Sequence, residues 1–244
     1  MQFQYKELKK LYEKITSLGV TKTFSEKYKK NSFLIRHDID FDLQKALIIA
    51  ILENEIGVKS TFFIMVTCEH YNVLSPMNKE IINQIKSFGH EIGIHFDPSI
   101  YDDYKKEFTN QVNVLENIIG NKVSSVSLHN PSIHGIYPFF ENFNNSYFDP
   151  FYNENFYISD SCFDFRGKDM FTFIEQIKEN SIQILIHPIH FSVNGGKEYI
   201  PILNEMIKNR TEKMVIHLKE NKSFNDEVHR GYFINEQIIK LQDV

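Results

Sequence analysis

The sequence has no tryptophan, only two cysteines and no excess of basic residues. Cys68 and Cys162 lie far apart and form no C-x-x-C motif, so we expect two reduced core residues. The formal net charge is −5, from 27 basic and 32 acidic side chains. A protein that binds nucleic acid needs basic side chains to neutralise phosphates. The sequence therefore predicts no nucleic-acid partner.

Long apolar runs are also missing. No stretch approaches the ~18 apolar residues of a membrane-spanning helix. Residues 1–20 are charged and read as an amphipathic helix, without the apolar core and small-residue cleavage site of a signal peptide. We expect no membrane span and a cytoplasmic location.

The sequence does contain enough apolar residues, 42%, for a full hydrophobic core. Short apolar runs alternate with helical patterns, which predicts an α/β protein of parallel strands with right-handed crossovers. We see no linker or repeat, so we expect a single domain over residues 1–244. The predicted strands are 32–40, 58–65, 90–96, 122–130, 155–160 and 181–188. The predicted helices are 41–57, 76–89, 102–120 and 168–180, with a long loop at 131–156, a mostly helical region from about Lys197 and a short strand at 231–234.

Polar residues follow the apolar runs at their carboxyl ends. Such residues end five of the six predicted strands: Asp38 and Asp40, His95, His129, Asp160 and His187. In an α/β barrel these strand ends meet at one mouth, where such folds carry their chemistry. A single histidine at a strand end is usually a hydrogen-bonded core residue, but residues from five strands together indicate a site.

The segment HDID places two carboxylates on one face of a strand. Side chains alternate along a strand, so Asp38 and Asp40 point the same way. They repel each other unless a cation or a shared proton offsets their charge. One carboxylate can then bind a metal while the other acts as a base. The alternative, which stays open here, is that Asp40 or Asp42 caps the next helix and Asp38 pairs with Arg36.

Six short motifs, in order, resemble those of the polysaccharide deacetylases, also called carbohydrate esterase family 4. They are IRHDID, GVKSTFFI, GHEIGIHFD, VSLHNPS, YISDS and LIHP, spread from Ile35 to Pro188. The chain resembles most a divergent branch with an RHD-x-D first motif. The resemblance implies a distorted or incomplete (β/α) barrel with parallel strands. It also implies metal-dependent hydrolysis of an N- or O-acyl group, usually an N-acetyl group on a sugar.

The resemblance assigns roles by position. Asp38 matches the general base, Asp40 and His95 match metal ligands, and His187 matches the general acid. Many members have an arginine in the third motif, and LHNPS has none.

We group two further residues, Asp160 and His190, with substrate binding. Asp160 matches an acidic position that orients or tunes the catalytic residues. His190 is close enough to His187 in the sequence to line the same pocket.

One ligand of the family pattern is absent. Typical members carry a second histidine four residues after the first, and here that position is Ser99. We expect His129, at the end of the neighbouring strand, to replace it, with Asp97 as the second candidate.

The sequence thus predicts a metal-dependent deacetylase, with zinc as the expected metal and an acetamido-sugar intermediate of surface glycan synthesis as the expected substrate. Two alternatives remain open. One is an amidase for a small non-sugar amide, and the other is a degenerate carbohydrate-binding protein without activity.

Overall fold

The computed structural model describes residues 2–178 and 180–230. Its contacts divide the chain into two compact units, Met1–Lys197 and Glu198–Val244. Every described strand lies in the first unit, and the second contains α7 (Tyr199–Leu218) and α8 (Lys222–His229). The single domain over 1–244 stays a prediction. No helix among the described residues has the length and apolar character needed to cross a membrane.

All strand pairs in the first unit are parallel. The strands follow the order β6-β5-β4-β3-β2-β8-β7, and β1 pairs with β2 beside this path. Among the described residues no pairing joins β6 to β7, so the barrel is open there. The predicted incomplete (β/α) barrel is confirmed. The strands are β1 (Val20–Lys22), β2 (Ser32–Ile39), β3 (Thr61–Ile64), β4 (Glu91–Phe96), β5 (Ser125–Leu128), β6 (Asn144–Asn145), β7 (Tyr157–Ser159) and β8 (Ile182–Ile186).

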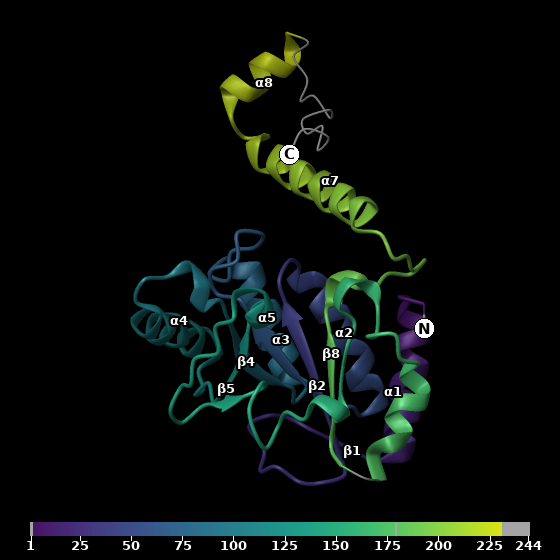
Figure 1. Cartoon of the computed structure of the whole chain (residues 1–244). Helices are drawn as coiled ribbons and strands as arrows, with labels where there is room; N and C mark the ends of the chain where they lie inside the picture. The colour runs from purple at the N-terminus through teal and green to yellow at the C-terminus, as the bar shows by residue number, and fades with distance from the viewer. Residues whose placement is uncertain (1, 179, 231–244) are drawn as a thin grey trace. The chain divides into compact units, whose positions relative to one another are not determined.

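Four helices of the first unit pack against one another in chain order (Figure 1). They are α1 (Tyr5–Leu18), α2 (Leu43–Ile56), α3 (Pro76–Ser87) and α4 (Tyr104–Ile119). The residues predicted to begin and end α2 are confirmed. The Asp42 carboxylate accepts hydrogen bonds from the backbone N–H groups of Gln44 and Lys45, and Gly57 ends the helix with φ +84°.

The inward-facing side chains of β2 change from apolar to polar along the strand. Leu34, Arg36 and Asp38 alternate with residues that face outward. Leu34 packs in a buried cluster with Phe24, Phe63 and Phe151. On the opposite face His37 bonds Glu53 of α2 at 2.8 Å, both fully buried. This apolar cluster fills the barrel beneath Arg36 and Asp38, so the charged side chains gather toward the carboxyl ends of the strands.

Gly93 in β4 shows how tightly the strands pack near this layer. A Cβ atom there would lie 2.6 Å from the Phe63 ring and 2.6 Å from Ser125 Oγ. Only glycine fits that approach, and it lies two residues before His95, on the same face of the strand.

Some predicted elements differ from the structure. The predicted helix 168–180 is confirmed in part, because it begins as α6 (Met170–Phe173) and continues as a 3₁₀ helix, η4 (Ile174–Lys178). The predicted loop 131–156 contains the short helix α5 (Pro131–His134) and β6. The remaining 3₁₀ helices are η1 (Pro98–Ile100), η2 (Glu154–Phe156), η3 (Ser161–Phe163) and η5 (Pro188–His190).

Two smaller expectations complete the comparison. Neither cysteine forms a disulfide bond among the described residues, as predicted, but only Cys68 is buried, whereas Cys162 is exposed on η3. The short strand expected at 231–234 lies outside the described residues.

Candidate active site

The carboxyl ends of the strands open into one pocket of about 500 Å³. Five of the predicted site residues line it: Asp38, Asp40, His95, His129 and His187. They come from the ends of β2, β4, β5 and β8, as expected where parallel strands converge on one mouth. The convergence predicted from the sequence is therefore present.

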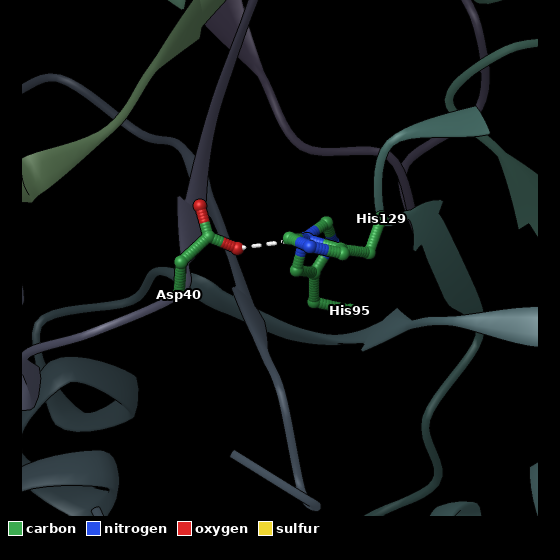
Figure 2. Close-up of side chains that lie close together, drawn as sticks. All are labelled: Asp40, His95 and His129. Atoms are coloured by element: carbon green, nitrogen blue, oxygen red, sulfur yellow. Dashed lines mark hydrogen bonds and ion pairs between the residues drawn. The ribbon is translucent and has the colours of Figure 1, made fainter. Parts of the chain in front are cut away.

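Asp40, His95 and His129 form a compact group (Figure 2). Asp40 Oδ1 lies 3.1 Å from His95 Nε2 and 3.1 Å from His129 Nδ1. The two ring nitrogens are themselves 3.1 Å apart. His95 lies near the end of β4 and His129 directly follows β5, and these strands are paired neighbours. Their adjacency brings the two imidazoles together.

This triangle fits a divalent metal ion. Four ligands at about 2.1 Å around zinc lie about 3.4 Å from one another, close to the spacing seen here. On the outer side of the rings, Asn130 Nδ2 lies 2.9 Å from His129 Nε2, whereas His95 Nδ1 is buried without a hydrogen-bond partner, 3.8 Å from Asp38 Oδ2. When both rings are neutral and unprotonated at the nitrogens nearest Asp40, His95 Nε2 and His129 Nδ1 would join Asp40 Oδ1 as three ligand atoms.

The electrostatics of the group keep its carboxylate ionised. Burial raises the pKa of Asp40, but hydrogen bonds from His129 and His95 outweigh it and hold that pKa well below its usual value. Burial lowers the pKa of His129, and the Asp40 carboxylate outweighs this and raises it. An ionised carboxylate is the form that binds a metal.

Asp97, the second candidate for the missing ligand, has another role. Its Oδ1 accepts hydrogen bonds from the backbone N–H of Ser99 at 2.9 Å and from Ser99 Oγ at 2.6 Å. It therefore caps η1, and it is absent from the pocket lining. This geometry favours His129 over Asp97, and the ligand assignment is taken up as a proposal below.

Asp38 is the second carboxylate of the pocket, and only 3% of its side chain is exposed. Oδ2 accepts hydrogen bonds from Ser127 Oγ at 3.0 Å and from Arg36 Nη2 at 3.3 Å. Oδ1 has no protein partner among the described residues. One oxygen is thus fixed and the other is available to a proton.

Arg36 is the positively charged partner of Asp38, 3.3 Å away. It is fully buried and also donates to Tyr147 Oη at 2.7 Å and to Ser146 Oγ. Burial lowers its pKa, but the Asp38 carboxylate outweighs this and raises the pKa further above its usual value. Arg36 lies two residues before Asp38, on the same face of β2, and this spacing was the signal in the sequence.

His187 follows β8 and is held from behind by Asp160. His187 Nδ1 lies 2.6 Å from Asp160 Oδ1, and the His187 backbone N–H donates to Oδ2 at 2.9 Å. Burial lowers the pKa of His187, but the charge and hydrogen bond of Asp160 outweigh it and raise the pKa to about 9. The ring is therefore protonated at neutral pH, with Nε2 3.8 Å from Asp40 Oδ2.

Asp160 and His190 lie behind His187 rather than in the pocket wall. Asp160 is fully buried, and its Oδ2 lies 3.0 Å from His190 Nδ1. Neither residue is among those that line the pocket. This placement gives Asp160 an orienting role and removes the geometric basis for direct substrate contact by either residue.

Aromatic side chains from the long loop divide between pocket and core. Tyr137, Tyr147 and Tyr152 line the pocket. Phe140 instead stacks on Phe108 of α4, with ring centres 3.6 Å apart. Three tyrosines of the loop thus line the pocket, while Phe140 packs in the core.

No family model matches the chain, and no curated protein matches it. Solved structures do. A mutant of a carbohydrate esterase family 4 pseudoenzyme from Bacillus anthracis, with restored enzymatic activity, matches with a TM-score of 0.44 at 13% identity. The match covers 76% of this chain and 64% of that one, so this chain spans less than two thirds of its length.

Two further structures match at similar levels. A polysaccharide deacetylase from Bacillus cereus has a TM-score of 0.42 at 16% identity, over 74% of this chain and 87% of that one. A peptidoglycan deacetylase from Bdellovibrio bacteriovorus has a TM-score of 0.43 at 13% identity, over 79% and 54%. These similarities are low, so the side chains of the pocket have to carry any conclusion about function.

Proposed function

We propose that the protein is a metal-dependent deacetylase that hydrolyses the N-acetyl group of an amino sugar. The observation that carries the proposal is the triangle of Asp40, His95 and His129 beside two further titratable groups, Asp38 and His187, in one pocket. A base, a candidate metal site and a protonated acid together match the needs of amide hydrolysis.

We assign the metal site to Asp40, His95 and His129, with zinc as the metal. A bound divalent ion supplies Lewis-acid chemistry, which makes water a stronger nucleophile and balances negative charge. The outer nitrogens of the two rings, His129 Nε2 and His95 Nδ1, lie 2.9 Å from Asn130 Nδ2 and 3.8 Å from Asp38 Oδ2.

The protein's own residues move the protons. Asp38 Oδ1 takes a proton from the attacking water while Arg36 and Ser127 hold Oδ2. The water oxygen bonds to the acyl carbon, and the carbon–nitrogen bond breaks. His187 gives its proton to the departing nitrogen, which leaves as an amine rather than as an unstable anion. The products are acetate and the free amino sugar.

The substrate we propose is an acetamido sugar. Tyrosines 137, 147 and 152 offer ring faces and hydroxyls, and Ser159 and Ser161 add two hydroxyls on β7 and η3. A pocket of this polar and aromatic composition suits a sugar better than an apolar amide. The test is acetate release from a panel of acetamido sugars, with and without a chelator. Release that the chelator leaves unchanged would reject the metal-dependent reaction, and release only from small non-sugar amides would favour the other amidase.

His187→Ala is expected to slow an amide far more than an activated ester. An amine needs a proton to leave, whereas a nitrophenolate does not, so the loss should be about 10²–10⁴-fold for the amide alone. The measurement is kcat for both substrate types in one variant. His134→Ala, which removes an imidazole outside the pocket lining, is the matched control. Equal slowing of both substrates would give His187 a structural role.

Asp160→Asn is expected to shift the pH dependence of amide hydrolysis. The pKa of His187 is raised to about 9, mainly by Asp160 acting against burial. Activity that needs protonated His187 is full below that pKa and is lost as the pH rises through it. Without the charge of Asp160 the pKa falls, so the basic limb of kcat should move down by about one pH unit or more. If the basic limb of kcat does not move, Asp160 does not set the pKa of the catalytic acid.

A further inference from the structure

One wall of the pocket comes from a single stretch of chain. Tyr157, Ser159, Ser161 and Arg166 all line the pocket, and they lie on β7 and in the segment that follows it. This stretch carries a guanidinium and three hydroxyls but no carboxylate that lines the pocket. It is chemically unlike the part of the pocket that carries Asp38 and Asp40.

Arg166 differs in its partners from His187, which also lines the pocket, and from Arg36, which is buried outside the lining. Arg36 and His187 are each bound to a buried carboxylate. Among the described residues no carboxylate forms an ion pair with Arg166, and its guanidinium carbon lies 5.4 Å from the centre of the Tyr157 ring. An exposed guanidinium placed against an aromatic face keeps its N–H donors free for a planar anion.

The backbone that presents Arg166 is unusual. Three non-glycine residues in the segment have left-handed φ angles: Cys162 at 58°, Phe163 at 54° and Arg166 at 56°. Such conformations persist only where the surroundings impose them, and they cluster at functional sites. Here the anchor is aromatic, because Phe163 and Phe165 are buried against Phe3.

Together these features describe a fixed positive group in the pocket wall. Phe163 and Phe165 anchor the segment in the core against Phe3, and Arg166, the next residue, lines the pocket. Two serine hydroxyls lie on the same wall. Guanidinium and hydroxyl donors on a rigid backbone are the groups that bind phosphate and carboxylate.

We propose that Arg166 is a specificity-determining residue that binds an anionic substituent, a phosphate or a carboxylate, on the amino-sugar substrate. This inference rests on the proposed function for the sugar and adds the charge of the substrate. Ser159 and Ser161, whose hydroxyls are hydrogen-bonded to each other at 2.6 Å, line the same pocket. The substrate class is then an acidic or phosphorylated acetamido sugar rather than a neutral one.

The test measures binding and turnover separately. Calorimetry gives Kd for three amine products, glucosamine 1-phosphate, muramic acid and glucosamine, with the wild-type protein, Arg166→Gln and Arg166→Lys. We expect the wild type to bind the phosphate or the carboxylate probe at least about tenfold more tightly than glucosamine, and Arg166→Gln to lose that preference. Arg166→Lys should keep part of it. The charged probe that the wild type prefers, glucosamine 1-phosphate or muramic acid, identifies the substituent as a phosphate or a carboxylate.

Lys168→Gln is the matched control, because it removes one positive charge from the same segment outside the pocket lining. It should leave the preference intact. Equal affinity of the wild type for charged and neutral probes, or an unchanged preference in Arg166→Gln, would overturn the inference. Acetate release from the corresponding N-acetyl compounds reports on the proposed function by itself. Charge-dependent binding without release would reject the deacetylase and retain the anion site.

Discussion

Asp38→Asn should lower kcat for amide hydrolysis by about 10²–10⁴-fold and leave metal content unchanged. The variant keeps the shape of the side chain but cannot accept the proton of water. Asp38 touches the candidate metal group only through His95, at 3.8 Å, so no ligand is lost. Acetate release gives the rate, and elemental analysis gives the metal content.

The control for this variant is Asp40→Asn, which should lose both metal and activity. Circular dichroism checks that both variants fold, because Asp38 is paired with the buried Arg36. Near-normal turnover in Asp38→Asn would remove its role as a base. Equal metal loss in the two variants would instead make both carboxylates ligands.

His129→Ala should weaken metal binding as severely as His95→Ala. Each variant removes one corner of a triangle whose edges are 3.1 Å. Loss of an outer-shell partner alone costs about 10–100-fold in metal affinity, so loss of a ligand should exceed about 100-fold. Competition with a chromogenic chelator measures the affinity.

Asp97→Ala is the matched control for the ligand assignment. It removes a polar side chain two residues after His95, and its present hydrogen bonds all go to Ser99. The variant should keep its metal and lose only the cap of η1. Full metal content in His129→Ala together with metal loss in Asp97→Ala would transfer the third ligand to Asp97.

Alternation along β2 made much of this site predictable. The pattern from 32 to 40 placed Asp38 and Asp40 on one face, and the order of the strands placed His129 beside His95. Asp42 does cap α2, and Asp38 does pair with Arg36, so the structural alternative for HDID describes real contacts. Those contacts coexist with the pocket because Asp38 Oδ1 remains without a protein partner among the described residues.

Other features depend on contacts that no local pattern encodes. β1 and β6 are three and two residues long, and neither has the period of a half-buried strand. Pairing with β2 and β5 makes them strands. Arg166 reaches the pocket only through left-handed backbone angles and the packing of distant aromatic rings, which the sequence does not reveal.

In the sequence, Ser99 stands where a second histidine ligand of the metal was expected. In the structure, Asp40, His95 and His129 form the candidate metal site on which the proposed function depends. The direct measurement is the metal content of the purified protein, prepared without a histidine tag and without added metal. The predicted result is about one divalent ion per chain, removed by a chelator together with the activity and restored with it. A chain that carries no metal, takes up none in titrations with zinc and still hydrolyses an acetamido sugar would contradict the account.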